Sequence, residues 1–357
     1  MEKKDLRILL VGPLPPPPGG DSTWDKQYLN YSRINNYNVK IVNTSVIGKR
    51  SLNVNDRFSI YDEFKRSLFI WCNIRNLIKE YQPDIIHFNS NISPKGIIRD
   101  YISSIIIKKR KIPFIIHCHT NVGYKLKNNK ISNYLLKKFF NNANKIIVLN
   151  TNSLNYSKKI TMTPICIIPN FIDLYNFKGN DYKVNEKISN VIFVGHVRKE
   201  KGIDELLIAA KKFHDIQFNI LGPITDDYKN YIFDSNVNAI GSVTYYEVID
   251  HIKKNDIFIF PSYTEGFSLA LLEAMAVGIP IIATDVGANK DMIEDKGGII
   301  IPPKDYQSLI DAINELKEVN KRKYMSKWNI QKVKKYYDID VVISELRRLY
   351  VEVINKK

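Results

Sequence analysis

The chain has 357 residues, of which 44% are hydrophobic and 25% charged, a composition typical of a folded globular protein and not of a disordered or fibrous one. This length is large for one domain and sufficient for two domains that each bury a core. The charged start MEKKDLR and the short apolar run LRILLVG match neither a signal peptide nor a membrane-spanning helix, so we expect a cytoplasmic protein.

The positive charge lies in the first half of the chain. Residues 1–175 contain 27 Lys and Arg against 11 Asp and Glu, and therefore carry the whole net charge of +16. Such a surface attracts anionic partners, either nucleic acid or the anionic leaflet of a membrane, and a merely solvated lysine-rich surface is the third explanation. The sequence contains no nucleic-acid recognition motif, so we expect no nucleic-acid partner.

Short apolar runs alternate with longer amphipathic stretches, which predicts βα units around parallel sheets. In the first half the predicted strands are 6–12, 37–43, 83–89, 112–119, 144–150 and 165–170. In the second half they are 190–195, 218–222, 237–241, 255–262, 279–285 and 297–303. Two successive sets of strands predict an α/β protein with two doubly wound, Rossmann-like domains.

We place the domains at 1–175 and 176–325, with a polar linker around Lys178–Lys187. The remaining segment, 326–357, is predicted to be helical; it either packs on the second domain or crosses back to the first, and we favour the crossing. Its last part has one apolar face at helical spacing, formed by Ile343, Leu346, Leu349, Tyr350 and Val353. Asp338 and Asp340 form a D-x-D that we interpret as the start of this helix and not as a metal motif.

The three cysteines, Cys72, Cys118 and Cys166, are far apart and belong to no metal-ligand pattern. We therefore expect reduced, buried thiols and no metal centre.

The strongest motif is SYTEGFSLALLEAMAVGIPIIATDVG, residues 262–287. It predicts a buried strand, a turn and a helix, and in an open α/β sheet ligands bind where a strand end meets a helix N-terminus. Backbone amides at such a helix start bind anions. The predicted amides are those of Gly266, Phe267, Ser268 and Leu269.

Glu265 lies in the predicted turn and Glu273 within the helix that follows. Carboxylates accept several hydrogen bonds from sugar hydroxyls, so one acid can hold a transferred sugar and the other a ribose. The alternative is a capping acid and a solvated helical Glu, which the apolar surroundings of Glu273 in LALLEAMA disfavour.

The motif EGFSLALLEAMAVGIPIIA (265–283) resembles the E-x7-E signature of glycosyltransferase family 4, whose members are retaining enzymes of the GT-B fold. FVGHVRKEKGIDELLIAA (193–210) and IPNFID (168–173) are similar to two further blocks of that family. The resemblance covers nearly the whole chain and implies two domains facing across a cleft. It also implies transfer of a sugar from a nucleotide-sugar to an acceptor.

Lys201 and Arg198 follow the strand 190–195. A departing nucleoside diphosphate gains negative charge, and these cations could stabilise it without a metal. The family has an arginine where this chain has His196, so either Arg198 or His196 takes that role. We favour Arg198, which is permanently charged.

Two features of the first half match the family by position. Gly19 and Gly20 follow the first strand, where family members close a loop over the donor diphosphate. His119 ends the strand 112–119, where the family has a histidine facing the reacting sugar. His117 lies on the same face of that strand and is the competing candidate, and we interpret His87 as structural.

The donor base and the acceptor are less constrained. The segment GSVTYYE (241–247), with Val243 as a donor-binding candidate, offers guanine a carboxylate only at Glu247, which favours UDP-sugars over GDP-sugars. The stretches 96–111 and 131–145 mix large apolar residues with Lys and Arg, as interfacial helices do, although helices that cover a sheet have the same pattern.

We therefore predict a metal-independent, retaining glycosyltransferase of the hexosyltransferase class, without a cofactor. It would act on a saccharide or lipid-linked acceptor in bacterial surface polysaccharide or lipopolysaccharide synthesis, with peripheral contact to an anionic membrane. The alternatives are a sugar-nucleotide epimerase with the same fold and, less favoured, a basic nucleic-acid-binding protein.

Overall fold

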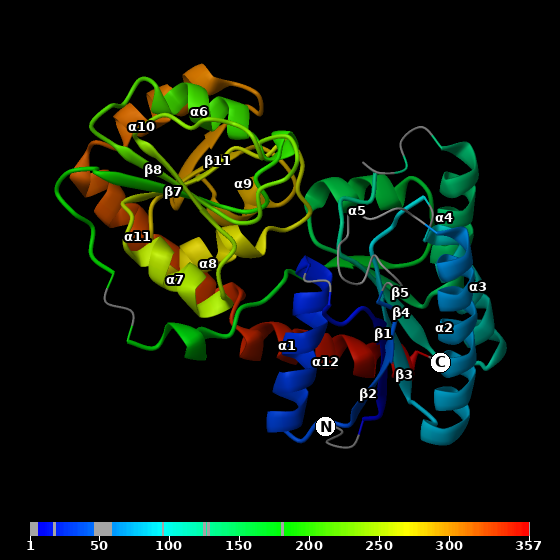
Figure 1. The fold of residues 1–357 in the computed structure, drawn as a ribbon. Coiled ribbons are helices and arrows are strands. Elements are labelled where there is room, and N and C mark those ends of the chain that lie inside the picture. The colour runs from blue at the N-terminus through cyan, green and yellow to red at the C-terminus, as the bar shows by residue number, and fades with distance from the viewer. Residues whose placement is uncertain are drawn as a thin grey trace. The chain divides into compact units, whose positions relative to one another are not determined.

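The computed structural model of the chain contains two compact units (Figure 1). The first consists of Met1–Asn170 and Ile343–Lys357, and the second of Phe171–Val342. The structure describes residues 6–16, 19–45, 59–94, 96–123, 126, 129–179 and 182–356.

The first unit is built on a parallel sheet of six strands in the order β2-β1-β3-β4-β5-β6. The strands are β1 (Ile8–Gly12), β2 (Val39–Asn43), β3 (Ile85–Ser90), β4 (Phe114–Cys118), β5 (Lys145–Val148) and β6 (Ile165–Ile167). The helices are α1 (Gly20–Ile34), α2 (Ile60–Tyr81), α3 (Ile97–Lys109), α4 (Lys130–Asn142) and α5 (Thr151–Lys158).

The second unit has a parallel sheet of six strands in the order β12-β11-β10-β7-β8-β9. The strands are β7 (Asn190–Val194), β8 (Gln217–Leu221), β9 (Val237–Gly241), β10 (Ile257–Phe260), β11 (Ile281–Thr284) and β12 (Gly298–Ile301). The helices are η2 (Leu174–Phe177), η3 (Lys199–Lys201), α6 (Ile203–Ala210), α7 (Tyr245–Lys253), α8 (Leu269–Val277), α9 (Asn289–Ile293), α10 (Tyr306–Glu315) and α11 (Val319–Tyr336). The last helix, α12 (Ile339–Asn355), begins in the second unit and continues into the first.

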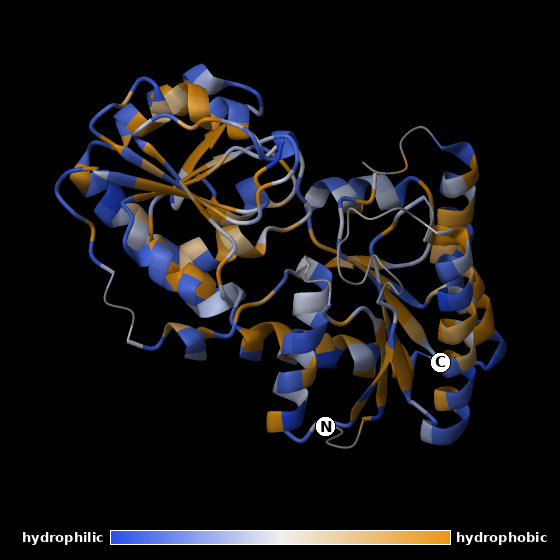
Figure 2. Ribbon diagram, viewed as in Figure 1, coloured by the Kyte–Doolittle hydropathy of each residue, from blue (hydrophilic) through white to orange (hydrophobic). Residues whose placement is uncertain are grey.

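All twelve predicted strands overlap the strands of the structure, and the predicted α/β fold class is confirmed. The prediction succeeds because strands covered on both faces by helices must be apolar along their whole length. β1, β4, β10 and β11 are fully buried, and the hydropathy colouring shows both sheets as hydrophobic cores (Figure 2).

The segment predicted as a linker is anchored to the second unit. The guanidinium of Arg322 is completely buried and donates to the carbonyls of Asn185 and Glu186 at 2.8 and 2.9 Å. Asp256 accepts from the backbone amide of Ser189 at 2.8 Å. The two compact units divide at Asn170/Phe171, close to the predicted division at 175/176 and, like it, before the predicted linker.

The C-terminal segment contains α11 and α12. The five residues of the predicted apolar face of α12, Ile343, Leu346, Leu349, Tyr350 and Val353, are all buried. Asp338 directly precedes α12 and accepts from the amide of Val342 at 3.0 Å through its carbonyl, as the helix-start interpretation requires.

One thiol prediction is wrong. Cys118 is buried and Cys166 is half-buried, but Cys72 is exposed on α2. None of the helices in the described ranges is long and apolar enough to cross a membrane.

Strand order identifies the ligand-binding edge of each sheet. The order reverses between β1 and β3 in the first unit and between β7 and β10 in the second. In open α/β sheets ligands bind at the carboxyl ends of the two strands that flank such a reversal. The loops after these four strands are therefore the places to look for a site.

Candidate active site

Predicted donor-binding residues come together at the reversal point of the second sheet. The loop after β7 carries His196, Arg198 and Lys201, and the loop after β10 carries Glu265. β7 and β10 are adjacent, parallel strands, so both loops leave the same edge of the sheet.

Lys201 and Glu265 form an ion pair, with Lys201 Nζ 2.5 Å from Glu265 Oε1. Both side chains are largely shielded, with exposed fractions of 16% and 12%. Lys201 Nζ also lies 5.3 Å from the centre of the Phe260 ring, at the end of β10. The sequence predicted both residues for the site but did not predict that the acid would bind the base.

A glycine fixes the approach of the two loops. Gly202 has φ +73°, and a Cβ at this position would lie 2.1 Å from the carbonyl oxygen of Pro261. The amide of Tyr263 donates to the carbonyl of Glu200 at 2.9 Å. Because Gly202 and Glu200 flank Lys201, these contacts hold its side chain toward the β10 loop.

The loop after β11 holds the other side of the β10 loop. Gly287 has φ +59°, and a Cβ there would lie 2.4 Å from the carbonyl oxygen of Glu265. The amide of Ala288 donates to the carbonyl of Gly266 at 3.0 Å. The Glu265 turn is thus fixed between two neighbouring loops, as a preorganised binding turn should be.

The start of α8 offers unpaired backbone amides. Ser268 is the N-cap residue, and its hydroxyl accepts from the amide of Leu271 at 3.2 Å. Within the described part of the chain, the amides of Ser268, Leu269 and Ala270 donate to no other group. Phe267, also a predicted residue, is buried with its ring 5.6 Å from that of Tyr337.

Glu273 lies in α8, half-buried, and burial raises the pKa of its carboxyl to about 8. No described side chain forms a hydrogen bond with it. On the neighbouring helix α7, burial and then the charge of Glu273 raise the pKa of the Tyr245 hydroxyl. The carboxyl of Glu273 is thus partly shielded from water and has no hydrogen-bond partner among the described side chains, an arrangement that is typical of ligand-binding acids.

Arg198 and His196 differ in charge. The Arg198 side chain is about half exposed, and its Nε lies 3.9 Å from Glu200, too far for a strong pair. The pKa of His196 is lowered by burial and then by the positive charges of Arg198 and Lys201. His196 is therefore neutral at pH 7, which leaves Arg198 as the second cation of the loop.

The segment before α7 carries the two remaining candidates of this unit. Glu247 accepts from the amide and the hydroxyl of Thr244, both at 2.7 Å, and these bonds lower the pKa of its carboxyl. Its carboxylate is thus used in capping its own helix. Val243 is half-buried directly before this cap.

In the first unit, the predicted glycines lie at the start of α1. Gly19 is the N-cap residue and Gly20 the first helical residue. A Cβ at Gly20 would meet no atom within 4 Å, so packing does not require a glycine there. In the first turn, Asp21 accepts a hydrogen bond from the side chain of Asn91, which follows β3.

His119 follows β4 at the same edge of the sheet. Its ring lies 5.3 Å from that of Trp24 and 4.1 Å from that of His117. Both ring nitrogens are buried without a hydrogen-bond partner among the described residues. Burial lowers the pKa of His119 to about 4, against the opposing effect of Asp21, so the ring is neutral at pH 7.

Behind His119 lies a row of buried rings. His117 Nδ1 is 3.2 Å from His87 Nε2, and His87 Nδ1 is 2.6 Å from the hydroxyl of Tyr350 on α12. His87 and His117 are completely buried, whereas His119 is half-buried. Of the two competing histidines, only His119 is therefore partly accessible at the sheet edge.

Asp25, a buried acid on α1, was not identified from the sequence. Asp25 accepts from the side-chain amide of Asn89, and a Cβ at Gly12 would lie 2.1 Å from Asp25 Oδ2. Burial, followed by the charge of Asp21, raises the pKa of Asp25 well above its usual range. The segment DSTWD directly after the glycine pair was the available signal.

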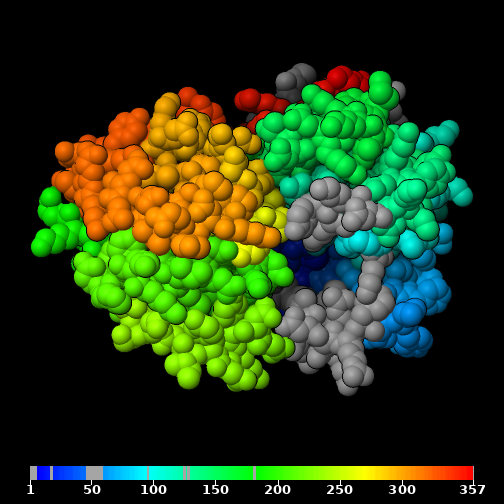
Figure 3. Space-filling model, turned by 90° about the horizontal axis from the view of Figure 1, so that it is seen from above, coloured from blue at the N-terminus to red at the C-terminus, as the bar shows by residue number. Residues whose placement is uncertain are grey.

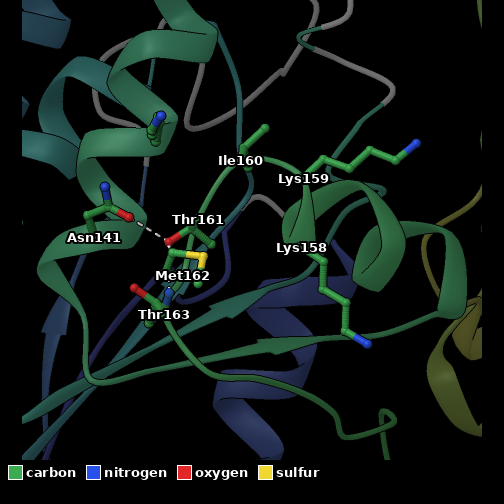
Figure 4. A pocket seen from close by; sticks show the side chains of 8 residues that line it. Asn141, Lys158, Lys159, Ile160, Thr161, Met162 and Thr163 are labelled. Atoms are coloured by element: carbon green, nitrogen blue, oxygen red, sulfur yellow. Dashed lines mark hydrogen bonds between the residues drawn. The ribbon is translucent and has the colours of Figure 1, made fainter.

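A pocket of about 480 Å³ lies elsewhere, between α4 and the segment after α5 (Figure 4). Its lining includes Asn141 and Thr161, which are hydrogen-bonded to each other at 2.6 Å, and the side chains of Lys158 and Lys159 point in different directions. The pocket adjoins the end of α4. Because a helix between parallel strands ends at the amino edge of the sheet, the pocket lies at the edge opposite the candidate site. None of the predicted site residues lines it.

No metal-binding group is found where the structure is described: no three His, Cys, Asp or Glu side chains there are grouped so that they could hold an ion.

Comparison with known proteins gives two family matches that cover consecutive parts of the chain. Residues 37–175 match the model of Glycosyltransferase Family 4, and residues 177–332 match Glycosyl transferases group 1. The second match contains the Lys201 and Glu265 loops and Glu273.

Three relatives have related names. A teichuronic acid biosynthesis glycosyltransferase of Bacillus subtilis is 25% identical over 66% of this chain, which spans 61% of that protein's length. The capsular polysaccharide biosynthesis glycosyltransferase CapM of Staphylococcus aureus is 23% identical, with 90% of this chain and 92% of CapM covered. A UDP-Gal:alpha-D-GlcNAc-diphosphoundecaprenol alpha-1,3-galactosyltransferase of Escherichia coli is 24% identical, with 80% and 79% covered.

A solved structure has the same fold. Anabaena HepE in complex with UDP-glucose superimposes with a TM-score of 0.70 at 15% identity, covering 99% of this chain and all of that one. The predicted fold and enzyme class are thereby confirmed: this chain is a glycosyltransferase of the family 4 type, with the two Rossmann-like domains of the GT-B fold.

Proposed function

We propose that the second unit binds a UDP-sugar and that the protein transfers the sugar, with retention and without a metal, to a saccharide or lipid-linked acceptor in bacterial surface polysaccharide synthesis. The observation that carries this proposal is the Lys201–Glu265 pair beside the unpaired amides of α8. The names of the relatives, which include capsular polysaccharide and a diphosphoundecaprenol-linked sugar, support the choice of pathway and acceptor.

The diphosphate would bind to the amides of Ser268 and Leu269 and to the cations Lys201 and Arg198. Helix N-termini and fixed cations both favour an anion, and their effect is largest where water is excluded. Glu265 has two functions in this proposal. One carboxylate oxygen orients Lys201, and the other accepts a hydrogen bond from a hydroxyl of the transferred sugar.

Glu273 would hold the ribose by accepting from its hydroxyl groups. These donors stabilise the ionised carboxylate, so binding of the nucleotide lowers the pKa from its value of about 8 in the free protein. The unfavourable burial of Glu273 is thus relieved only in the complex.

We favour uridine over guanine as the base. Guanine is recognised through N–H donors that suit a free carboxylate, but Glu247 uses its carboxylate in the Thr244 cap. Backbone groups near Val243 could still hold a uracil ring. HepE, whose structure contains UDP-glucose, provides an example of this donor in the same fold.

We assign the acceptor to the first unit, with His119 at the edge of its sheet, and we keep Gly19 and Gly20 as candidates for the donor diphosphate. A neutral imidazole whose pKa is about 4 is a weak general base at pH 7, so His119 would orient hydroxyl groups instead. The acceptor oxygen would attack the anomeric carbon on the face from which the diphosphate departs. The anomeric C–O bond breaks, and the departing phosphate takes the acceptor proton while Lys201 and Arg198 stabilise its charge.

A sugar-nucleotide epimerase remains the competing function. It would release nucleoside diphosphate or change the sugar without an acceptor, whereas a transferase releases UDP in proportion to the acceptor supplied.

A thermal-shift screen with UDP-, GDP- and ADP-sugars tests the donor assignment. We expect UDP-sugars to give the largest shift, and Glu273→Ala to abolish it while Glu80→Ala, an exposed acid on α2, leaves it intact. A full shift in Glu273→Ala would overturn the ribose assignment.

A further inference from the structure

Four completely buried rings form one hydrogen-bonded row in the first unit, which we call the ring row. The hydroxyl of Tyr28 on α1 lies 3.3 Å from that of Tyr350 on α12. The Tyr350 hydroxyl lies 2.6 Å from Nδ1 of His87 on β3, and Nε2 of His87 lies 3.2 Å from Nδ1 of His117 on β4. Each of the four residues has an exposed fraction of 0%. The ring row thus joins two helices to two adjacent strands of the sheet.

The C-terminal helix α12 forms one end of this arrangement. It lies beside α1 (Figure 1), and its red colour appears only at the margin of the face shown in Figure 3. Tyr350 therefore reaches the middle of the first sheet from a helix that is more than 200 residues further along the chain than β4.

Both imidazoles of the ring row are neutral at pH 7. Burial, followed by the proximity of His119, lowers the pKa of His87 to about 3. Burial, followed by the proximity of His119 and His87, lowers the pKa of His117 well below its usual range. A neutral imidazole carries one proton, so one ring nitrogen donates and the other accepts. The hydrogen bonds of the row can therefore be ordered in only two ways: all point from Tyr28 toward His117, or all point in the reverse direction.

The distances and the unsatisfied atoms favour the first direction. N–H donors lie about 2.7–3.2 Å from their acceptors and hydroxyl donors about 2.5–3.0 Å, so the separation of 2.6 Å indicates that the Tyr350 hydroxyl donates to His87 Nδ1. His87 then donates through Nε2 to His117 Nδ1, and His117 keeps its proton on Nε2. In the reverse direction Tyr350 would donate to Tyr28, whose own proton would have no acceptor among the described residues.

The His117 end of the row supports His119. The two rings are 4.1 Å apart and inclined by 36°. Neither ring nitrogen of His119 has a hydrogen-bond partner among the described residues, so ring contacts determine its orientation. The other such contact is with Trp24, at 5.3 Å, and Trp24 also meets the ring of His117 edge-on at 5.2 Å. A rotation of the His117 ring would therefore remove the surface against which His119 is held.

A purely structural role explains the ring row less well. A buried polar network costs stability relative to an apolar core unless every one of its groups is satisfied. The row has one unsatisfied atom among the described residues, His117 Nε2, and it belongs to the ring that contacts His119. An apolar ring in place of His87 would fill the same space without this cost. The row is therefore better explained by the residue that it positions.

We propose that Tyr350 is a positioning residue: its hydroxyl fixes His87 and, through it, His117 as Nε2–H tautomers, and the fixed ring of His117 holds His119 at the sheet edge. The inference rests on the proposed function, in which His119 orients hydroxyl groups of the acceptor. A ring held in one orientation presents its nitrogens in fixed directions. Loss of the Tyr350 hydroxyl should therefore impair alignment of the acceptor and leave donor binding unchanged.

¹⁵N NMR of the free protein, labelled at its histidines, tests the proposal without donor or acceptor. Long-range ¹H–¹⁵N correlations distinguish the two neutral tautomers. In the wild type we expect a single Nε2–H form at His87 and at His117. Tyr350→Phe should give a mixture of tautomers at both and should move the signals of His119. Tyr28→Phe removes the hydroxyl at the other end of the row and should leave the signals of all three histidines unchanged.

Three results of this experiment would overturn the proposal. The first is an Nδ1–H form at His87 or His117 in the wild type, and its detection needs no variant. The second is a set of His117 and His119 signals that Tyr350→Phe does not change. The third is an equal change in Tyr28→Phe, because the hydroxyl of Tyr350 would then not be the group that fixes the tautomers.

Turnover gives a second measurement. With a diphosphoundecaprenol-linked sugar as the probe acceptor, Tyr350→Phe should raise the acceptor KM at least about tenfold and keep the full UDP-sugar thermal shift. Tyr81→Phe is the matched control, because it removes a hydroxyl of the same unit that donates to the carbonyl of Asn38 at 2.7 Å, and it should behave like the wild type. An equal acceptor KM in the two variants would overturn the positioning role. A wild type with the expected tautomers that releases no UDP would contradict the proposed function instead.

Discussion

The proposed contact of Glu273 with the ribose predicts that donor binding depends on pH. Its pKa of about 8 in the free protein means that about 1% of the groups are ionised at pH 6 and about half at pH 8. In the proposed complex, the ribose hydroxyls donate to the ionised carboxylate of Glu273. A UDP-sugar should therefore bind about 50-fold more weakly at pH 6 than at pH 8, a difference of about 2.3 kcal/mol.

Isothermal titration calorimetry measures this effect directly. A UDP-sugar is preferred to UDP because its diester phosphates stay fully ionised over this range. In buffers of different ionisation enthalpy, we expect release of about one proton per bound donor at pH 6 to 7. Glu273→Gln should bind weakly at both pH values and release none, and Glu80→Gln should behave like the wild type. Wild-type affinity that does not change between pH 6 and pH 8, with no proton released, would refute the role given to Glu273.

Four further predictions concern the same elements. In the absence of donor, Glu273→Gln should raise the free energy of unfolding at pH 8 by up to about 4 kcal/mol. The raised pKa of Glu273 lowers the stability of the wild type as the pH rises from about 4.5 to 8, and glutamine removes this loss. Denaturant unfolding at pH 5 and pH 8 should therefore show the gain only at the higher pH. Lys201→Met should lower kcat/KM by about 10²- to 10³-fold through loss of a fixed cation, and a loss below about fivefold in a UDP-release assay would contradict this. Gly202→Ala should cost at least about 2 kcal/mol of unfolding free energy, whereas Gly179→Ala, with a similar φ of +75° but no atom within 4 Å of the new Cβ, should cost about 1 kcal/mol. The pH–rate profile of kcat/KM should have no inflection from His119 between pH 6 and 9, so an acid limb near pH 6.5 that disappears in His119→Asn would contradict its neutral state.

The fold could be predicted from sequence because inner strands such as β1, β4, β10 and β11 are buried on both faces and are therefore apolar along their length. The anchoring of the predicted linker could not be predicted from sequence. The polar segment near Asn185 looks like a linker, but its carbonyls bind the buried guanidinium of Arg322, which lies 137 residues further along the chain.

For the candidate site, the sequence identifies which residue types follow the two strands but not which of these residues contact each other. Lys201 and Glu265 are 64 residues apart, and their contact depends on the order of β7 and β10 in the sheet. The buried Asp25 and the ring row behind His119 were missed because a polar residue on one helix face gives no sign of which strands it will contact.

The central claim is that the Lys201–Glu265 pair, the first amides of α8 and Glu273 together bind a nucleotide-sugar. A crystal structure with a bound UDP-sugar tests it most directly. We predict diphosphate oxygens within hydrogen-bond distance of Lys201 Nζ and of the amides of Ser268 or Leu269, with the ribose hydroxyls on Glu273. A nucleotide bound away from these groups, or a ribose that leaves Glu273 without a contact, would contradict the account.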